Sequence, residues 1–485
     1  MTKLNLITIF ILILGIAGIF FVQFMTPTLY GADGYLHIRM AEFLRDLGPM
    51  YDFHWAKFST FTTNFSDKDF LYHALLIPFT FSDNIFHGAK VAAALFASFL
   101  FLGFYMILRK YSDKVVLPFF LIAFFLSDMF LQAISRPRPI SLVILLTIFS
   151  IHLLIHKKYR LLFFTALAYS LGHITSPLLI LYALIVEVVR YADKKEFCAK
   201  NIFAVFLGIL AGFIIHPNFP NNFSVFYLNS ILVPLYTIKA GVLELGAEFF
   251  PLNTRQFLLS YPVVIIGLIL LIFTAISKRP KAKFETSVFL TLAMFFLVLS
   301  FICRRYLSHG YLIMLIAFSS YFTDAVSDLK NINKKLIIGA SVLIILLGIG
   351  ISRTVRYNAI IARVVNTHYE QVGKWLEQNV PEGELIFHAN WSDSQYFIGL
   401  NPKNDYFVTL DPVYMHNPNP ELYKLYRDVS FGRTKDPYPV LKDTFKVKYG
   451  YISRNYFSGL IDQIKADSRF TILAEDSLGV IFRLM

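Results

Sequence analysis

The sequence predicts an all-α polytopic membrane domain, residues 1–355, followed by an α/β domain, residues 360–485, outside the cytoplasm. Of the 485 residues, 56% are hydrophobic and 17% aromatic, which is typical of a chain that crosses a membrane many times. Apolar runs recur at lengths near the ~20 residues that a helix needs to cross a bilayer. After residue 352 these runs give way to short β-type segments separated by turns.

The apolar runs predict about eleven transmembrane helices. The first follows a lone Lys3 and lacks a small-residue cleavage site, so we expect a retained span. The fifth and sixth are short and meet at 172–177, where they can form a broken or re-entrant pair. The expected spans are 5–26, 85–108, 115–134, 139–156, 161–173, 175–190, 201–215, 259–277, 285–303, 308–325 and 335–352.

The basic residues between the spans predict the orientation. They concentrate in short loops on one side, which places the N-terminus inside, loops 27–84 and 216–258 outside, and the C-terminal domain outside. The net charge of +13 comes almost wholly from the membrane part, because residues 353–485 carry 16 Lys and Arg against 15 Asp and Glu. This distribution argues against a nucleic-acid partner. Cys198 and Cys303 are expected on opposite sides and therefore cannot pair.

The first outer loop opens with ionisable residues directly after the first span. Asp33, His37 and Arg39 lie at the membrane surface, where charged groups are costly and usually functional. A helix over 34–47 would have Asp33 at its N-cap and His37 on the same face. The alternative is an amphipathic helix in the interface that Asp33 merely caps.

The same loop carries a second acidic cluster of Asp67, Asp69 and His73. With Asp33, these side chains can share a divalent cation such as Mg²⁺ or Mn²⁺, since hard cations prefer oxygen ligands. Equally, Asp67 can cap a helix. The sequence leaves open whether this cluster binds a metal ion.

Two outer segments carry paired arginines on the side that usually avoids them, Arg136 with Arg138 and Arg304 with Arg305. The planar guanidinium binds phosphate oxygens in pairs, so these residues suit a lipid phosphate. Simple snorkelling to phospholipid phosphates is the alternative.

The C-terminal region is predicted to be mixed α/β. Its expected strands are 384–388, 405–409, 448–452, 470–475 and 479–484, with helices near 366–379, 420–428 and 456–466.

The order of these motifs resembles the GT-C class of membrane glycosyltransferases, and within it the catalytic subunit of oligosaccharyltransferase. The resemblance implies that Asp33 is the first-loop acid, that Asp67 and Asp69 are the later acidic pair, and that Arg304 and Arg305 hold the carrier phosphate. Residues 245–252 resemble the small-x-Glu-x-x-Pro element of a mobile loop and contain Glu248. Trp391 and Asp393 stand where that family has its Trp-Trp-Asp acceptor motif, but one Trp is missing and no Tyr-Gly follows, which speaks against sequon recognition. The alternative for these two residues is a capped strand end with a Trp in the domain core.

The resemblance implies sugar transfer from a polyprenyl-phosphate carrier to a lipid, glycan or protein acceptor on the extracytoplasmic face of the cytoplasmic membrane. Asp33 would act as general base or would orient the acceptor hydroxyl, and inversion at the anomeric carbon is expected, while His37, Arg39, Arg136 and Arg138 would bind substrate. The competing class is a non-enzymatic carrier or flippase for lipid-linked sugars or other anionic lipids. A carrier or flippase normally has its functional charged residues near the bilayer midplane, whereas the ionisable residues of this chain are expected at the outer surface. No Walker-type glycine loop is present, so no nucleotide is expected.

The predicted orientation is testable by reporter fusion. A reporter after Met485 should be active outside the cytoplasm, and one near Lys195 only inside, because short basic loops are retained in the cytoplasm. A cytoplasmic C-terminus would contradict the grouping of Asp33 with the C-terminal domain.

Overall fold

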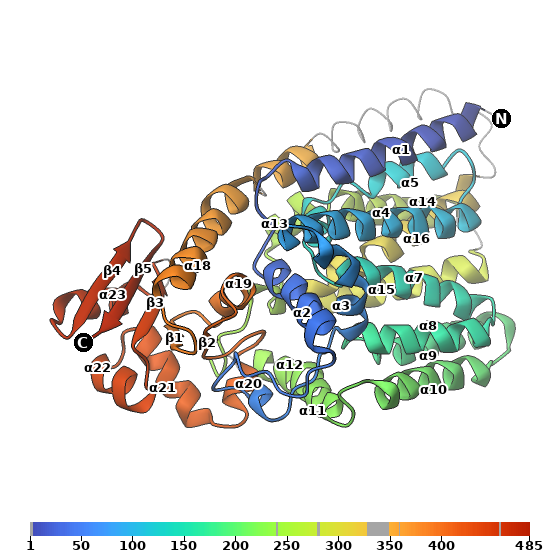
Figure 1. Ribbon diagram of the computed structural model, residues 1–485. Coiled ribbons are helices and arrows are strands. Elements are labelled where there is room, and N and C mark those ends of the chain that lie inside the picture. The colour runs from blue at the N-terminus through green and yellow to red at the C-terminus, as the bar shows by residue number, and fades with distance from the viewer. Residues whose placement is uncertain (1–2, 239–240, 279–281, 327–348, 358, 455–456) are drawn as a thin grey trace.

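The computed structural model describes residues 3–238, 241–278, 282–326, 349–357, 359–454 and 457–485. A bundle of roughly parallel helices forms one part of the molecule, and a domain with a small sheet lies at one end of it (Figure 1). The bundle helices are α1 (Lys3–Phe24), α4 (Ile85–Tyr111), α5 (Leu117–Ala123), α6 (Asp128–Ser135), α7 (Ile140–Ile155), α8 (Tyr159–Gly172), α9 (Leu178–Lys194), α10 (Ala199–Ile215), α14 (Pro262–Lys278), α15 (Phe284–Ser300) and α16 (Arg305–Val326).

The lengths of these helices bear on the expected number of spans. In the described ranges, α1 and α4 are long and apolar enough to cross a membrane alone, and two bent pairs would raise that number to four. The bent pairs are α5 with α6, at 69°, and α13 (Thr254–Ser260) with α14, at 87°. The fifth and sixth expected spans correspond to α8 and α9, which residues 173–177 separate, and a re-entrant pair there stays a prediction. Eleven spans therefore stays a prediction, and the last of them, 335–352, lies almost wholly outside the described residues.

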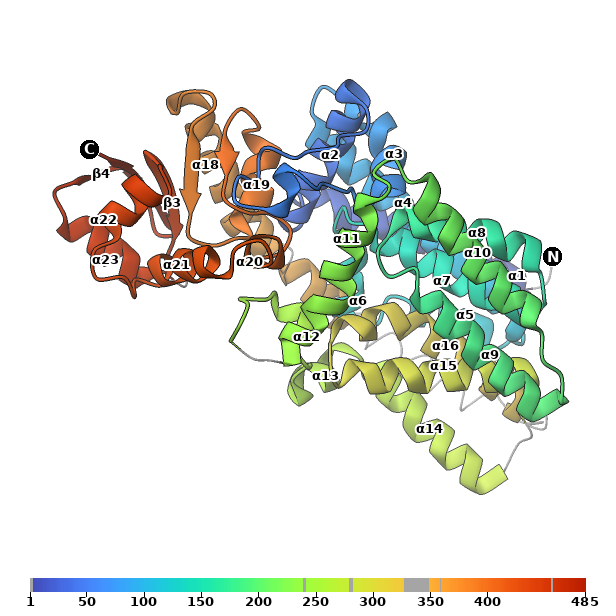
Figure 2. The same ribbon diagram turned by 90° about the horizontal axis from the view of Figure 1, so that it is seen from below.

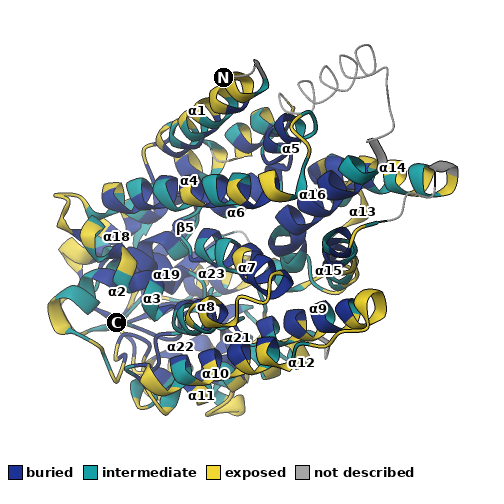
Figure 3. Ribbon diagram, turned by 90° about the vertical axis from the view of Figure 1, so that its right-hand side faces the viewer, coloured by how far each residue is buried: buried dark blue, intermediate teal, exposed yellow. Residues whose placement is uncertain are grey.

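Burial within the bundle separates inner from outer helices. The central part of α16, from Tyr311 to Ala317, is at most 1% exposed. Outer helices expose large apolar side chains, among them Phe10 on α1, Phe203 on α10 and Phe273 on α14 (Figure 3). Extended apolar surfaces of this kind are rare on soluble monomers and are expected where lipid surrounds the protein.

The C-terminal domain is built on a five-stranded sheet in the order β2-β1-β3-β5-β4. The β1–β2 and β1–β3 pairs are parallel, and β5 runs antiparallel to β3 and β4. Every expected strand is present, and so are the three expected helices. The elements are η5 (Ile361–Asn366), α18 (Thr367–Asn379), β1 (Leu385–His388), α19 (Asp393–Leu400), β2 (Asp405–Tyr406), α20 (Val413–His416), α21 (Pro420–Ser430), α22 (Pro437–Pro439), η6 (Val440–Thr444), β3 (Tyr449–Ser453), α23 (Ser458–Ala466), β4 (Phe470–Glu475) and β5 (Gly479–Leu484).

The two long loops carry helices of their own. The first contains α2 (Asp33–Leu47), η1 (Thr60–Thr62), α3 (Phe70–Leu76) and η2 (Ile77–Phe81). The second contains α11 (Asn221–Tyr227), η3 (Leu228–Leu232), α12 (Val233–Ile238), η4 (Ala247–Phe249) and α13. Figure 2 shows α2 and α3 between the bundle and the C-terminal domain.

The first loop packs directly onto the C-terminal domain. Tyr406 of β2 donates its backbone N–H to the Trp55 carbonyl and accepts from the Lys57 N–H, each at 2.7 Å, so the loop extends the sheet at its β2 edge. Side chains from both regions share one hydrophobic core, in which Tyr35 and Phe397 are fully buried. Gly399 on α19 permits the closest approach, because a Cβ there would lie 2.7 Å from the Tyr35 backbone. This packing positions the start of α2, where the candidate site begins.

Candidate active site

Asp33 lies in the first turn of α2. The expected N-cap role is wrong, because the N-cap residue is Ala32 and no side chain caps the helix. Instead, Oδ2 of Asp33 lies 2.8 Å from Nε of Arg138, in an ion pair whose side chains are about a quarter exposed. The sequence therefore placed this acid on the correct helix but missed its partner, which lies more than a hundred residues away in the chain.

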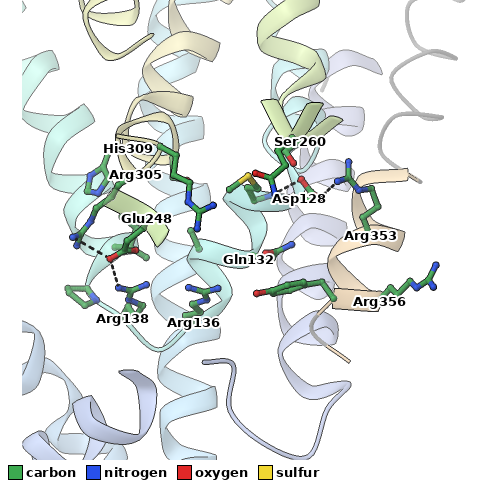
Figure 4. Close-up of a pocket in the computed structure, with 18 of the residues that line it drawn as sticks. Asp128, Gln132, Arg136, Arg138, Glu248, Ser260, Arg305, His309, Arg353 and Arg356 are labelled. Carbon is green, nitrogen blue, oxygen red and sulfur yellow. Dashed lines mark hydrogen bonds and ion pairs between the residues drawn. The ribbon is translucent and has the colours of Figure 1, made fainter. Parts of the chain in front are cut away.

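Glu248 extends this ion pair into a chain of charges. Its Oε1 atom lies 3.6 Å from Nη2 of Arg138 and 3.6 Å from Nη1 of Arg305 (Figure 4). Burial alone would raise the pKa of Glu248, but Arg305 and Arg138 beside it lower the pKa to about 2. The carboxylate is thus an anion at neutral pH, held between two guanidinium groups that come from different parts of the bundle.

The same residues border a cavity of about 590 Å³, within the ~300–1,000 Å³ usual for ligand sites. It is lined by six arginines, namely Arg136, Arg138, Arg304, Arg305, Arg353 and Arg356, and by only two carboxylates, Asp128 and Glu248. Asp128 pairs with Arg353 at 3.1 Å. Among the described residues, no carboxylate lies within ion-pair distance of Arg136, Arg304 or Arg356. The cavity therefore carries an excess of positive charge that an anionic ligand can neutralise.

Several lining residues were not predicted from the sequence. His309 follows Arg305 by one helical turn, and Arg356 follows Arg353 by three residues, so helical spacing was an available signal for both. Asp128 follows Ser127, whose side chain caps α6, and nothing in that local pattern indicates a cavity. His173 lies between α8 and α9, and only its place in the fold brings it to this cavity.

His37, His73 and Asp67 form a buried hydrogen-bonded chain beneath the start of α2. Nδ1 of His73 lies 2.7 Å from Oδ2 of Asp67, and Nε2 of His73 lies 2.7 Å from Nδ1 of His37. If the carboxylate accepts the Nδ1 proton of His73, then Nε2 of His73 accepts from Nδ1–H of His37. Burial, and then the charge of His73, lower the pKa of His37 well below its usual value. This buried chain of hydrogen bonds joins α2 to α3 and fixes the orientation of one helix against the other.

Asp69 lies beside this chain, close to His173 of the arginine cavity. Its Oδ2 pairs with Lys68 at 2.8 Å, and its Oδ1 lies 3.9 Å from Nε2 of His173, which lines the cavity. Burial opposes ionisation, but Lys68 and His173 hold the pKa of Asp69 well below its usual range. Asp69 therefore links the acidic cluster of the first loop to the cavity.

The expected metal site of Asp33, Asp67, Asp69 and His73 does not fit this arrangement. Within the described parts of the chain, no three His, Cys, Asp or Glu side chains are placed so that they could hold a metal ion. Asp33 is engaged by Arg138, and Asp67 is engaged by His73. We therefore derive no step through a metal at these residues.

The remaining expected substrate-binding residues join structural elements. Arg39 donates from Nε to the Gly399 carbonyl at 2.9 Å and pairs with Glu42, so it ties α2 to α19. Trp391 donates from Nε1 to the Glu244 carbonyl at 2.7 Å, which ties the C-terminal domain to the second loop.

Asp393 is also placed differently from its expected role at an acceptor site. It is 1% exposed, and its Oδ1 accepts from the Tyr369 hydroxyl at 2.6 Å. Its side chain is thus part of the domain core in this conformation.

Comparison with known proteins agrees with this architecture. No family model matches the chain, and no curated protein matches its sequence. Among solved structures, the oligosaccharyltransferase AglB of Archaeoglobus fulgidus matches with a TM-score of 0.64 and 10% identity, over 92% of this chain and 69% of that one. ArnT of Cupriavidus metallidurans, bound to undecaprenyl phosphate, matches with a TM-score of 0.61 and 12% identity, over 99% of this chain and 98% of that one.

A third similar structure is the mycobacterial arabinofuranosyltransferase AftD, with a TM-score of 0.55 and 13% identity, over 100% of this chain and 40% of that one. At these identities the likeness establishes the fold. The chain therefore has the fold of the GT-C membrane glycosyltransferases, as the sequence motifs suggested.

The buried position of Asp393 predicts a pH-dependent stability. Burial raises the pKa of Asp393 to about 7 from 3.8, so stability is fully present below about pH 4 and is lost as pH rises through 7. Between pH 5 and pH 8 the free energy of unfolding should therefore fall less for Asp393→Asn than for wild type, and the difference should reach up to a few kcal/mol. The measurement is the unfolding midpoint of the detergent-solubilised protein at both pH values.

Asp462→Asn, on the exposed face of α23, is the matched control and should keep the wild-type pH slope. An Asp393→Asn slope equal to that of wild type would contradict the assigned burial. Loss of sugar transfer without any change in slope would instead restore its role at the acceptor.

Proposed function

We propose that this protein is an integral-membrane glycosyltransferase that moves a sugar from a polyprenyl-phosphate carrier to an acceptor on the extracytoplasmic face. The chain of charges Asp33–Arg138–Glu248–Arg305, at the edge of the arginine-lined cavity, carries this proposal. Complexes of similar folds support the class of donor, since AglB has been solved with dolichol-phosphate and ArnT with undecaprenyl phosphate.

The donor phosphate would bind where Glu248 now bridges two arginines. A phosphate presents the negative oxygens that the guanidinium groups of Arg138 and Arg305 prefer, and it carries more charge than a carboxylate. Glu248 lies on η4 of the second loop, so a movement of that loop would displace it from the two arginines. Arg304 and Arg136, which line the same cavity, supply further positive charge.

Asp33 would then act as general base. While Arg138 engages the donor phosphate, the Asp33 carboxylate is released to accept the proton of an acceptor hydroxyl. The acceptor oxygen forms a bond to the anomeric carbon as the bond from that carbon to the carrier phosphate breaks. The carrier phosphate leaves with the electron pair, and the arginines stabilise its charge. A single displacement of this kind inverts the anomeric carbon.

The buried cluster of the first loop would position the acceptor side of the site. The Asp67–His73–His37 chain holds α2 against α3, and Asp69 faces His173 at the cavity. Trp391 lies at the contact between the second loop and the C-terminal domain, so an acceptor of lipid, glycan or protein type bound there would influence η4 and Glu248.

Arg305→Gln tests the donor site. Loss of one charge-assisted contact is worth roughly 1.5–3 kcal/mol, so we expect the KM for a polyprenyl-phosphate donor to rise by about 10- to 100-fold. Arg363→Gln removes an exposed arginine two helical turns beyond Arg356 and outside the cavity lining, and should leave KM unchanged. Equal KM values in both variants would indicate that Arg305 does not bind the donor and only reaches phospholipid phosphates.

Asp33→Asn separates an enzyme from a carrier that uses the same arginines. The amide keeps the size of the side chain but cannot accept the proton, so transfer should fall by at least ~10²-fold while donor binding persists. Transfer and binding are measured with purified protein in nanodiscs. If this variant transfers sugar at the wild-type rate, the result would favour a carrier or flippase over an enzyme.

Adding EDTA to the same transfer assay tests whether activity requires a metal ion. Because the described residues hold no grouped metal ligands, we expect transfer to survive chelation. Loss of activity on EDTA treatment, restored by Mg²⁺ or Mn²⁺, would show that these acids regroup around an ion in the substrate complex.

A further inference from the structure

A second cavity lies at the opposite end of α7 and α16, two helices that also line the arginine cavity. Its volume is about 530 Å³, and it is bordered by the ends of α4, α7 and α16 and by the start of α15. These helices run roughly parallel in the bundle (Figure 1). From Arg305 in the first cavity to Ser320 in the second, α16 advances roughly 20 Å, at about 1.5 Å per residue. The two cavities are therefore separate sites.

Side-chain hydrogen bonds join the helix ends around this second cavity. The Thr286 hydroxyl on α15 lies 2.6 Å from the Ser320 hydroxyl and donates to Oδ2 of Asp324 at 2.8 Å, both on α16. The backbone N–H of Asp113, just after α4, donates to Oγ1 of Thr323 at 3.0 Å. Polar and ionisable groups on membrane helices are costly and usually functional, so this cluster requires an explanation.

A directed chain of hydrogen bonds connects α4 with the end of α7. The ammonium of Lys110 can only donate, so Nε2 of His152 accepts at 3.1 Å, and Nδ1–H of His152 donates to the Tyr111 hydroxyl at 2.7 Å. That hydroxyl donates in turn to Nε2 of His156 at 3.3 Å. The Tyr111 ring also contacts Phe289 of α15 edge-on, with 4.9 Å between the ring centroids. Tyr111 therefore lies between the end of α7 and the start of α15.

The charges around the second cavity are balanced. Its lining contains three lysines and three carboxylates, namely Lys110, Lys158, Lys283, Asp113, Glu285 and Asp324, whereas the arginine cavity has six arginines and two carboxylates. Lys283 pairs with Asp324 at 3.0 Å. Among the described residues, Lys158 and Glu285 form no ion pair. A complementary ligand therefore carries both signs of charge and little net charge.

The two signs lie on opposite sides of Tyr111. Lys110 is bonded to His152, and Lys158 follows α7 directly, so the basic side is at the end of that helix. Glu285 is in the first turn of α15, one helical turn before the Phe289 ring that contacts Tyr111. A ligand that bridges this cavity would meet ammonium groups on one side and a carboxylate on the other.

We propose that the second cavity binds a phosphoethanolamine head group, as carried by phosphatidylethanolamine in the cytoplasmic leaflet. The phosphate binds Lys110 and Lys158, and the primary ammonium donates to Glu285, each through a charge-assisted hydrogen bond. The basic loops predict that this end of the bundle faces the cytoplasm. This lipid site lies away from the chemistry of sugar transfer and does not depend on the proposed function.

Three phospholipids with identical acyl chains differ at the group that the site should recognise. The ammonium of phosphatidylethanolamine has three N–H donors, the trimethylammonium of phosphatidylcholine has none, and phosphatidylglycerol has a phosphate without a cation. Affinities are measured by native mass spectrometry of the full chain in detergent. We expect phosphatidylethanolamine to bind at least ~10-fold more tightly than the other two, the value of one charge-assisted contact.

Two variants with matched controls test the two sides of the site. Glu285→Gln should lower the affinity for phosphatidylethanolamine to that for phosphatidylcholine, whereas Asp193→Asn, an exposed acid in the last turn of α9 and outside the cavity lining, should not. Lys158→Gln should weaken all three lipids, whereas Lys114→Gln, an exposed lysine outside the lining, should not. Lys158 is itself exposed, so its variant remains informative if the change at Glu285 impairs folding.

Soluble O-phosphoethanolamine distinguishes the source of the head group. Competition at a concentration equal to that of the lipid identifies a soluble ligand from the cytoplasm, and no competition at a ~100-fold excess identifies the membrane lipid.

The proposal is overturned if phosphatidylglycerol binds wild type as tightly as phosphatidylethanolamine, because the lysines would then attract anionic lipids without selecting the ammonium. It is also overturned if Glu285→Gln keeps the wild-type preference, or if Lys158→Gln binds every lipid as Lys114→Gln does.

Discussion

The contact between α2 and α19 is the interaction on which the site depends. Gly399 lets the two helices approach until their backbones touch, and Arg39 donates to the Gly399 carbonyl across the same interface. A side chain at position 399 would push α2 away from the C-terminal domain, and Asp33 would move with it. The pairing of residues 55–58 with β2 secures the other end of the loop. The position of Asp33 thus depends on the folding of a domain that begins more than three hundred residues later.

Electrostatics explain why Glu248 and Asp33 are found beside arginines. The guanidinium groups around the cavity repel one another, and carboxylates between them reduce the electrostatic free energy of this repulsion. The same arrangement favours exchange, because a phosphate can replace a carboxylate at the same two donors. The ion pairs of this chain are about a fifth to a third exposed, so each adds little stability to the resting protein. Their value lies in keeping the cationic site intact and accessible.

The buried polar groups near the site act mainly as scaffold. The Asp67–His73–His37 chain is enclosed, and its hydrogen bonds specify one arrangement of α2 and α3. Asp393 and Tyr369 perform a similar task within the C-terminal domain. The spacing of Asp67 and Asp69 suggested metal ligands, yet each finds a different partner in the fold. Short acidic motifs therefore predicted that these residues lie near one another but not which partner each carboxylate would have.

The sequence alone predicted the helical membrane class, the position of the five strands, the helix near Asp33, and four of the six arginines that line the cavity, namely Arg136, Arg138, Arg304 and Arg305. These features follow from local patterns, because hydrophobic period and charge placement act over a few residues. Tertiary structure alone decided that Asp33 meets Arg138, that Glu248 bridges Arg138 and Arg305, and that Arg353 and Arg356 enter the same cavity. Such contacts join residues that lie more than fifty positions apart in the chain, and no local pattern encodes which distant charge will neutralise which. The packing of helices and of the C-terminal domain makes that choice.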